Sequence, residues 1–82
     1  MEKRFKSEIK AFGKRLKSIR VKKGLSQLDL ELESGISRTE ISRIENGLKN
    51  IEFFTLIKLA VALQIDVKDF FQNRFMNSTT VG

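Results

Sequence analysis

The 82-residue sequence predicts an all-α fold, a compact five-helix bundle organised around the segment Gln27–Gly47. In that segment, Ser37 and Glu40 match the S-x-x-E capping box, in which a hydroxyl and a carboxylate satisfy backbone donors at a helix start. Gly35 precedes the box and supplies a left-handed backbone conformation, which lets the chain turn sharply between two helices. Outside this segment, apolar residues recur every three or four positions, as on the buried face of a helix.

The first predicted helix starts at a Ser7 cap and ends near Lys23. Inside it, Gly13 costs about 1 kcal/mol relative to alanine. This glycine either permits a close approach or marks where a flexible N-terminal turn joins the domain. Residues 1–6 are predicted to form a flexible basic arm, which either reaches a phosphate or a minor groove or frays as a chain end. The apolar face of this helix comprises Phe5, Ile9, Phe12, Leu16 and Ile19.

The second predicted helix covers Gln27–Ser34 and follows a weaker capping signal, Ser26 with Asp29. Leucines alternate with acids along it, a pattern that also suits a half-buried strand. The helix is favoured because the run is short, has no β-branched or aromatic residue, and lies between a cap and a glycine. A third helix is predicted from about Arg38 to Asn46. The residues expected to be buried where these two helices cross are Leu30, Gly35, Ile36, Ile41 and Ile44.

The fourth predicted helix runs from Glu52 to Leu63, with either Glu52 or Asn50 as its cap. Asp66 with Asp69 begins a short fifth helix that fades near Arg74. We therefore expect one domain over residues 7–74 and a disordered tail over residues 75–82. The core face of the fourth helix is predicted to comprise Phe53, Leu56, Leu59, Ala60 and Leu63.

The composition argues against several functional classes. The chain has no cysteine and no histidine, so disulfides, thiolate or imidazole metal sites and the usual catalytic bases are missing. We expect no enzyme activity, no metal, no cofactor and no small-molecule ligand. The longest uninterrupted apolar run, Leu59–Leu63, has five residues, whereas a membrane span requires roughly 20. The N-terminus lacks the apolar region of a secretory signal, and we therefore expect a cytoplasmic protein.

The net charge of +6 is concentrated at the N-terminal end of the chain. Residues 1–25 carry ten Lys or Arg against two Glu, whereas residues 26–49 carry three basic side chains against five acidic ones. A basic stripe of this kind is typical of a protein that binds a polyanion, although solvated lysines are its default interpretation. Together with two helices joined by a tight turn, the stripe favours nucleic acid as the partner.

The segment from Phe12 to Phe71 resembles the Cro and phage-repressor (XRE) type of helix-turn-helix regulator, a lambda-repressor-like DNA-binding domain. Within that family, the runs RTEIS and GLKNI are similar to the controller proteins of restriction-modification systems. The family usually has alanine where Glu31 stands, so either Glu31 leans out to solvent or the two helices cross at a wider distance. The shared motifs are Q-x-x-L at Gln27–Leu30, G-[IV]-S at Gly35–Ser37, I-x-x-I-E-N-G at Ile41–Gly47 and L-x-x-L-A-x-A-L at Leu56–Leu63.

The resemblance implies a sequence-specific transcriptional regulator that binds a palindromic double-stranded DNA operator as a homodimer, with the third helix in the major groove. It also implies an ion pair between Arg20 and Glu45. Base readout is expected from Arg38, Thr39, Ser42 and Arg43, and phosphate contacts from Gln27, Ser37, Lys49 and Lys17. Alternatively, Gln27 caps the neighbouring helix and Lys49 is merely solvated.

A second apolar stripe on the fourth helix predicts the dimer interface. Phe54, Ile57 and Val61 follow i, i+3, i+7 on a face offset from the core stripe. Ile65 and one of Phe70 or Phe71 extend it into a patch larger than a soluble monomer commonly exposes, and we assign this position to Phe71. Alternatively, Phe54 folds back over the loop that precedes the helix.

A rival function from another class is a protein-interaction module, such as an antitoxin or adaptor, on the same fold. Such a module would bind its partner through the apolar surface of the fourth and fifth helices. Its affinity for DNA would be weak and non-specific.

Overall fold

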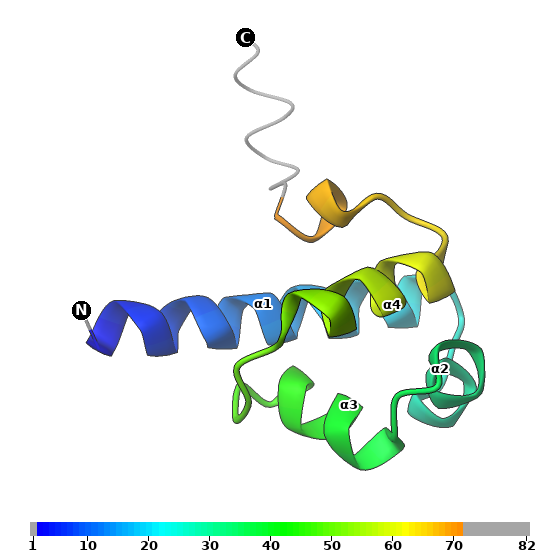
Figure 1. The fold of residues 1–82 in the computed structure, drawn as a ribbon, viewed down its shortest axis with the longest axis horizontal. Coiled ribbons are helices and arrows are strands. Elements are labelled where there is room, and N and C mark those ends of the chain that lie inside the picture. Colours follow the sequence, from blue (N-terminus) through cyan, green and yellow to red (C-terminus); the bar gives the residue numbers. More distant parts are fainter. Residues whose placement is uncertain (1, 72–82) are drawn as a thin grey trace, which may run out of the picture.

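The computed structural model describes residues 2–71, which form four α-helices and one 3-10 turn, with no strand in that range (Figure 1). The elements are α1 (Glu2–Lys22), α2 (Gln27–Ser34), α3 (Arg38–Glu45), α4 (Phe53–Leu63) and η1 (Val67–Phe70). The prediction of an all-α fold is confirmed, but the fifth helix is only the short turn η1. Its expected end near Arg74 and the predicted tail over residues 75–82 lie outside the described residues. No helix within residues 2–71 is long and apolar enough to cross a bilayer.

Helix α1 begins at Glu2, so the expected start at Ser7 is wrong. The residues before Ser7 are mostly charged side chains with good helix propensity, and the acidic Glu2 is favourable at the positive end of the helix dipole. The first turns of α1 project beyond α3 and α4 (Figure 1). Phe5, which was expected on the core face, is therefore exposed, and Ile9 is half-buried.

The two helices of the predicted helix-turn-helix have the bounds that their caps indicated. Ser26 Oγ accepts the Asp29 N–H at 2.9 Å, and the Asp29 carboxylate accepts the Ser26 N–H at 2.9 Å. At α3, Ser37 Oγ accepts the Glu40 N–H at 3.1 Å, and Asn46 is the C-cap. The reciprocal capping box expected for Ser37 and Glu40 is thus only half formed, and the pair with the weaker signal, Ser26 and Asp29, forms the complete box. Gly35 has φ +78° and ends α2, as a sharp reversal of the chain requires.

The Ser26 backbone N–H, and after it the Ser26 hydroxyl, lower the pKa of the Asp29 carboxyl below its ordinary value. A carboxyl with a depressed folded-state pKa stabilises the fold above its unfolded pKa, whose ordinary value is 3.8. That contribution is lost as the pH falls through the folded value.

The core lies between α1, the α2–α3 pair and α4. The Phe12 and Phe70 ring centroids are 5.2 Å apart, which places η1 on α1, and the Arg15 Nε donates to the Phe70 carbonyl. The buried apolar residues are Phe12, Leu16, Leu30, Ile36, Ile41, Ile44, Leu56, Leu59, Ala60, Leu63 and Phe70. Phe53 was expected among them, but it is 68% exposed. It occupies the first position of α4, and the buried stripe of that helix starts one turn later at Leu56.

Helix α4 has Glu52 at its N-cap position, without a hydrogen bond from the Glu52 side chain to the helix. Asn50 lies outside the helix, so the earlier start that it would allow is wrong. At the other end, Gln64 takes a left-handed conformation with φ 60°. Apolar packing therefore accounts for more of this helix's stability than capping does.

Gly13 permits the close approach of α1 to the end of α3. A Cβ at this position would lie 2.8 Å from the Glu45 carbonyl oxygen and would also clash with the Ile44 carbonyl oxygen. Backbone atoms cannot swing aside as the end of a flexible side chain can. Of the two explanations for this glycine, the structure therefore supports the close approach.

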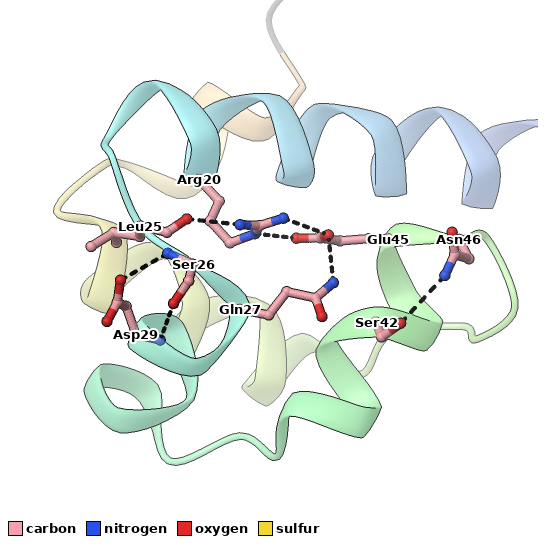
Figure 2. A network of polar contacts seen from close by, with 8 residues as sticks. All are labelled: Arg20, Leu25, Ser26, Gln27, Asp29, Ser42, Glu45 and Asn46. Carbon is pink, nitrogen blue, oxygen red and sulfur yellow. Dashed lines mark hydrogen bonds and ion pairs between the residues drawn. The ribbon is translucent and has the colours of Figure 1, made fainter.

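A buried ion pair joins the helices at this crossing (Figure 2). The Arg20 Nε donates to Glu45 Oε2 at 2.7 Å and Nη2 donates to Oε1 at 3.0 Å, a two-pronged geometry. Arg20 Nη1 donates to the Leu25 carbonyl at 2.7 Å, and Gln27 Nε2 donates to Glu45 Oε1 at 3.0 Å. The charged side chains are 8% and 2% exposed. The network thus ties α1, the loop after it, α2 and α3 together.

Removing either charge of this pair should destabilise the fold, because the remaining charge would be buried without its partner. We expect Arg20→Ala and Glu45→Ala each to lower the free energy of unfolding by about 3 kcal/mol. Urea denaturation followed by circular dichroism measures this loss. Lys17→Ala, an exposed change one turn earlier on α1, is the control and should have little effect. A loss below about 0.5 kcal/mol in both variants would contradict a buried, stabilising pair.

Candidate DNA-binding surface

One face of α3 is polar and open to solvent. Arg38, Thr39 and Arg43 are exposed and Ser42 is half-buried, whereas Ile41 and Ile44 on the other side are fully buried in the core. The helix is therefore held by its apolar side and leaves its basic and hydroxyl-bearing side chains outside. Guanidinium and hydroxyl groups on one helix can donate hydrogen bonds to base edges in a major groove.

An open hollow of about 270 Å³ lies beside this face. Its lining brings together two of the four expected base-reading residues and two of the four expected phosphate contacts, along with one acid. The lining residues are Ser37, Thr39, Glu40, Arg43 and Lys49. Lys49 Nζ lies 4.0 Å from Glu40 Oε2, both side chains being partly exposed, so the attraction between them is weak and screened by salt. The Lys49 ammonium therefore remains available to an anion.

Asn46 belongs to the same surface, although the sequence did not single it out. It is exposed at the C-cap of α3, and its Nδ2 is 3.4 Å from the Ser42 Oγ (Figure 2). An amide donates and accepts hydrogen bonds and can read adenine. The signal that could have identified Asn46 is its spacing, since it lies three and four residues after Arg43 and Ser42 on the helix surface.

Gln27 lies in the first turn of α2, but its amide is engaged inside the protein. Its Nε2 donates to Glu45 Oε1 at 3.0 Å, which places Gln27 between α2 and the buried ion pair (Figure 2). The amide group has a second N–H and a carbonyl oxygen for an outside partner. Gln27 is thus part of the buried hydrogen-bond network, and this role does not depend on a contact with DNA.

Lys17 is the phosphate candidate that the structure sets apart from the others. It is exposed on α1 and does not line the hollow beside α3. Its neighbours on that helix surface are Lys14 and Lys10, three and seven residues earlier, both exposed. It therefore belongs to the basic surface of α1.

The acid at the helix crossing, Glu31, is half-buried, and its carboxylate makes a surface contact with α3. Its Oε1 accepts the backbone N–H of Arg38 at 3.0 Å, so the side chain reaches from α2 to the first residue of α3. The two residues are seven apart in the chain and are joined by the turn. No local sequence pattern indicates such a contact.

The residues expected at a dimer interface are only partly covered. Phe54 is 65% and Val61 70% exposed, Phe71 is exposed, and Ile57 and Ile65 are half-buried. Phe54 is not covered by the loop before α4, so the alternative in which the Phe54 side chain folds back over that loop is wrong. The Lys58 ammonium instead lies 4.7 Å from the centre of the Phe54 ring. Phe53, which was not expected here, adds to the exposed apolar side chains at the start of α4.

Within residues 2–71, no group of three or more carboxylates lies where it could share a metal ion. The chemistry that the α3 surface offers is hydrogen bonding and charge. The donors are guanidinium, ammonium, hydroxyl and amide groups from α3 and from the loop that follows it. Such groups suit a phosphate backbone and the base edges next to it.

Comparisons with known proteins agree with this geometry. A family profile described as Helix-turn-helix matches residues 16–70. The control protein C.BamHI of Bacillus amyloliquefaciens is 35% identical over 72 residues, which are 87% of this chain and 83% of that protein.

Solved structures with the same fold include two controller proteins. The crystal structure of the restriction-modification controller protein C.AhdI from Aeromonas hydrophila matches with a TM-score of 0.78 and 37% identity, over 79% of this chain and 98% of that one. The controller protein C.Esp1396I, solved as a tetramer with its natural 35-base-pair operator, matches with a TM-score of 0.73 and 27% identity, over 90% and 95% of the two chains. The chain therefore belongs to the XRE-type helix-turn-helix family of transcriptional regulators, which includes the restriction-modification controller proteins.

Proposed function

We propose that this protein is a sequence-specific transcriptional regulator that binds a palindromic double-stranded DNA operator as a homodimer, with α3 in the major groove. It acts in the cytoplasm and controls a restriction-modification system. The observation that carries the proposal is the exposed polar face of α3, fixed to the core by Ile41 and Ile44. The operator complex of C.Esp1396I supports DNA as the ligand.

Base readout rests on the four side chains of that face and their chemistry. Arg38 and Arg43 can each donate two parallel hydrogen bonds to guanine O6 and N7. Thr39 offers its methyl group to thymine and its hydroxyl to several acceptors, and Ser42 offers a hydroxyl. The helix α3 has only eight residues, and these four side chains lie within about one and a half of its turns. A surface of this length matches one half-site of a few base pairs.

The phosphate contacts position the protein without reading sequence. Ser37 and Lys49 line the hollow beside α3, where a backbone phosphate next to the groove would lie. Gln27 contributes through its second amide N–H or through the N-terminus of α2, where backbone donors favour an anion. Lys17 and the other lysines of α1 add a longer-range attraction that depends on salt.

The dimer is proposed to form through the exposed apolar side of α4. Phe54, Ile57 and Val61 share that side, and Phe53 lies one turn before Ile57. Ile65 and Phe71 follow α4 in the chain and extend the surface. Covering these side chains in a two-fold dimer removes apolar area from water. It would also set two α3 helices about 34 Å apart, one turn of DNA, as two half-sites require.

Substitutions on α3 should separate base reading from phosphate binding. The binding site is first selected from a random pool of DNA duplexes, and affinities are then measured for single-base variants at several salt concentrations. We expect Arg38→Ala and Arg43→Ala to lose about 1 to 3 kcal/mol of discrimination at particular base pairs. Lys49→Ala should weaken binding to all sequences alike and reduce the dependence on salt.

Lys68→Ala is the control for these variants, because η1 lies on the other side of α1 from α3 (Figure 1). Wild-type base preferences in both arginine variants would show that α3 is not the reading helix. Affinity near the non-specific level for every selected duplex would instead favour the protein-interaction module.

The dimer surface is tested by placing a charge on it. Phe54→Glu and Val61→Glu should dissociate the dimer, because a carboxylate in an apolar interface is desolvated without a partner. Sedimentation velocity measures the mass, and circular dichroism checks that helicity is retained. Leu32→Glu is the matched control, since Leu32 is 75% exposed on α2 and lies outside the proposed interface. An unchanged dimer mass in both α4 variants would place the interface elsewhere.

A further inference from the structure

We propose that Glu31 tunes DNA binding in two ways, one acting on selectivity and one on overall affinity, and this inference rests on the proposed function. Its carboxylate holds the first backbone amide of α3 and so fixes the base-reading residue Arg38. Its negative charge opposes the phosphates of any DNA that approaches. The anchor raises discrimination between sequences, and the charge lowers affinity for all of them.

The first element of the argument is how completely the turn between α2 and α3 is hydrogen-bonded. Gly35 N–H donates to the Glu31 carbonyl at 2.8 Å, which closes the end of α2. Ser34 Oγ donates to the Leu30 carbonyl at 2.7 Å and accepts the Ile36 N–H at 3.1 Å. The turn is therefore rigidly bonded on the α2 side, and Glu31 is part of that rigid end.

The second element is that the same residue also holds the α3 side of the turn. Its Oε1 accepts the Arg38 N–H at 3.0 Å, while the Ser37 Oγ accepts the Glu40 N–H at 3.1 Å. The amides of the first helical turn have no partner within the helix and attract anions. In this helix, two of them already bind side-chain oxygens of the protein. The Glu31 carboxylate thus binds a backbone N–H at the start of α3 to which a phosphate oxygen could otherwise bind.

The anchor matters for recognition because it acts on Arg38 itself. Bidentate contact of a guanidinium with guanine requires the arginine backbone to be held at the correct height above the groove. Arg38 is exposed and follows directly after a turn, so packing restrains it less than it restrains Ile41 or Ile44. The Glu31 carboxylate provides this restraint, and Glu31 is therefore a positioning residue.

The charge of Glu31 has a separate effect. Glu31 lies four residues after Gln27, on the same side of α2 as a proposed phosphate contact. A carboxylate there repels specific and non-specific DNA equally. Selectivity depends on the difference between two affinities, so this uniform penalty lowers the affinity for right and wrong sites alike and leaves their ratio unchanged.

Two substitutions separate these roles. Glu31→Gln keeps an oxygen acceptor for the Arg38 N–H and removes the charge, whereas Glu31→Ala removes both. The matched controls are Glu33→Gln and Glu33→Ala, because Glu33 is exposed on the opposite side of α2. Affinities are measured by fluorescence anisotropy for the selected site, its single-base variants and an unrelated duplex, at two salt concentrations. Thermal melting confirms that each variant is folded at the assay temperature.

We expect Glu31→Gln to raise affinity for all duplexes together, by about threefold at low salt, with unchanged base preferences. Glu31→Ala should also raise affinity for unrelated DNA, but it should lose about fivefold or more discrimination at the base pair that Arg38→Ala affects. The Glu33 variants should change affinities by less than about twofold, because salt screens an exposed charge on the far side of the helix.

The anchoring role would be overturned if Glu31→Ala kept the wild-type discrimination between base pairs. It would also be overturned if Glu31→Gln lost as much discrimination as Glu31→Ala. Unchanged affinity of Glu31→Gln for unrelated DNA would overturn the role of the charge. If the wild-type protein selects a DNA site but the Glu31 variants give any of these results, only this inference fails. If the wild-type protein selects no DNA site, the proposed function fails with it.

Discussion

The ion pair between Arg20 and Glu45 is the interaction on which the arrangement of the helices depends. It is buried at the crossing of α1 and α3, and Gln27 and the Leu25 carbonyl complete its hydrogen bonds. Burying two charges is unfavourable unless their geometry and remaining hydrogen bonds compensate, and in this network each group has a partner. Such a pair does not merely add stability. It specifies one relative placement of the two helices, since a shift would leave a buried charge unpaired.

The exposed surface follows from this placement. With α1 held against the end of α3 at Gly13, the apolar side of α3 faces the core and its polar side faces solvent. The turn before α3 is fixed by hydrogen bonds from α2, so the side chains that we assign to base reading start from a rigid backbone. Preorganisation of this kind reduces the ordering that binding would otherwise require. The long helix α1 packs behind that surface, and its exposed lysines carry much of the positive charge of the chain.

Local signals in the sequence predicted the helix-turn-helix well, because each cap involves residues three apart. The α2 and α3 bounds follow from Ser26 and Ser37 in this way. The start of α1 was misjudged because a cap signal at Ser7 does not stop a run of good helix formers. Phe53 was assigned to the core by periodicity alone. Periodicity does not reveal whether another element packs over a given side chain, and in the structure the Phe53 side chain is left exposed. The Glu31 contact and the Gln27 contact join residues across turns and helices, where spacing in the sequence carries no information.

Chemical protection of a selected DNA site tests the central claim, that α3 reads the major groove in two symmetric half-sites. Dimethyl sulfate methylates guanine N7 in the major groove and adenine N3 in the minor groove. The atoms that the bound protein shields from methylation therefore report which groove it occupies. The account predicts protection of guanine N7 in two symmetric clusters about 34 Å apart on one face of the duplex. Protection of adenine N3 alone, or binding without protection of any base, would contradict it.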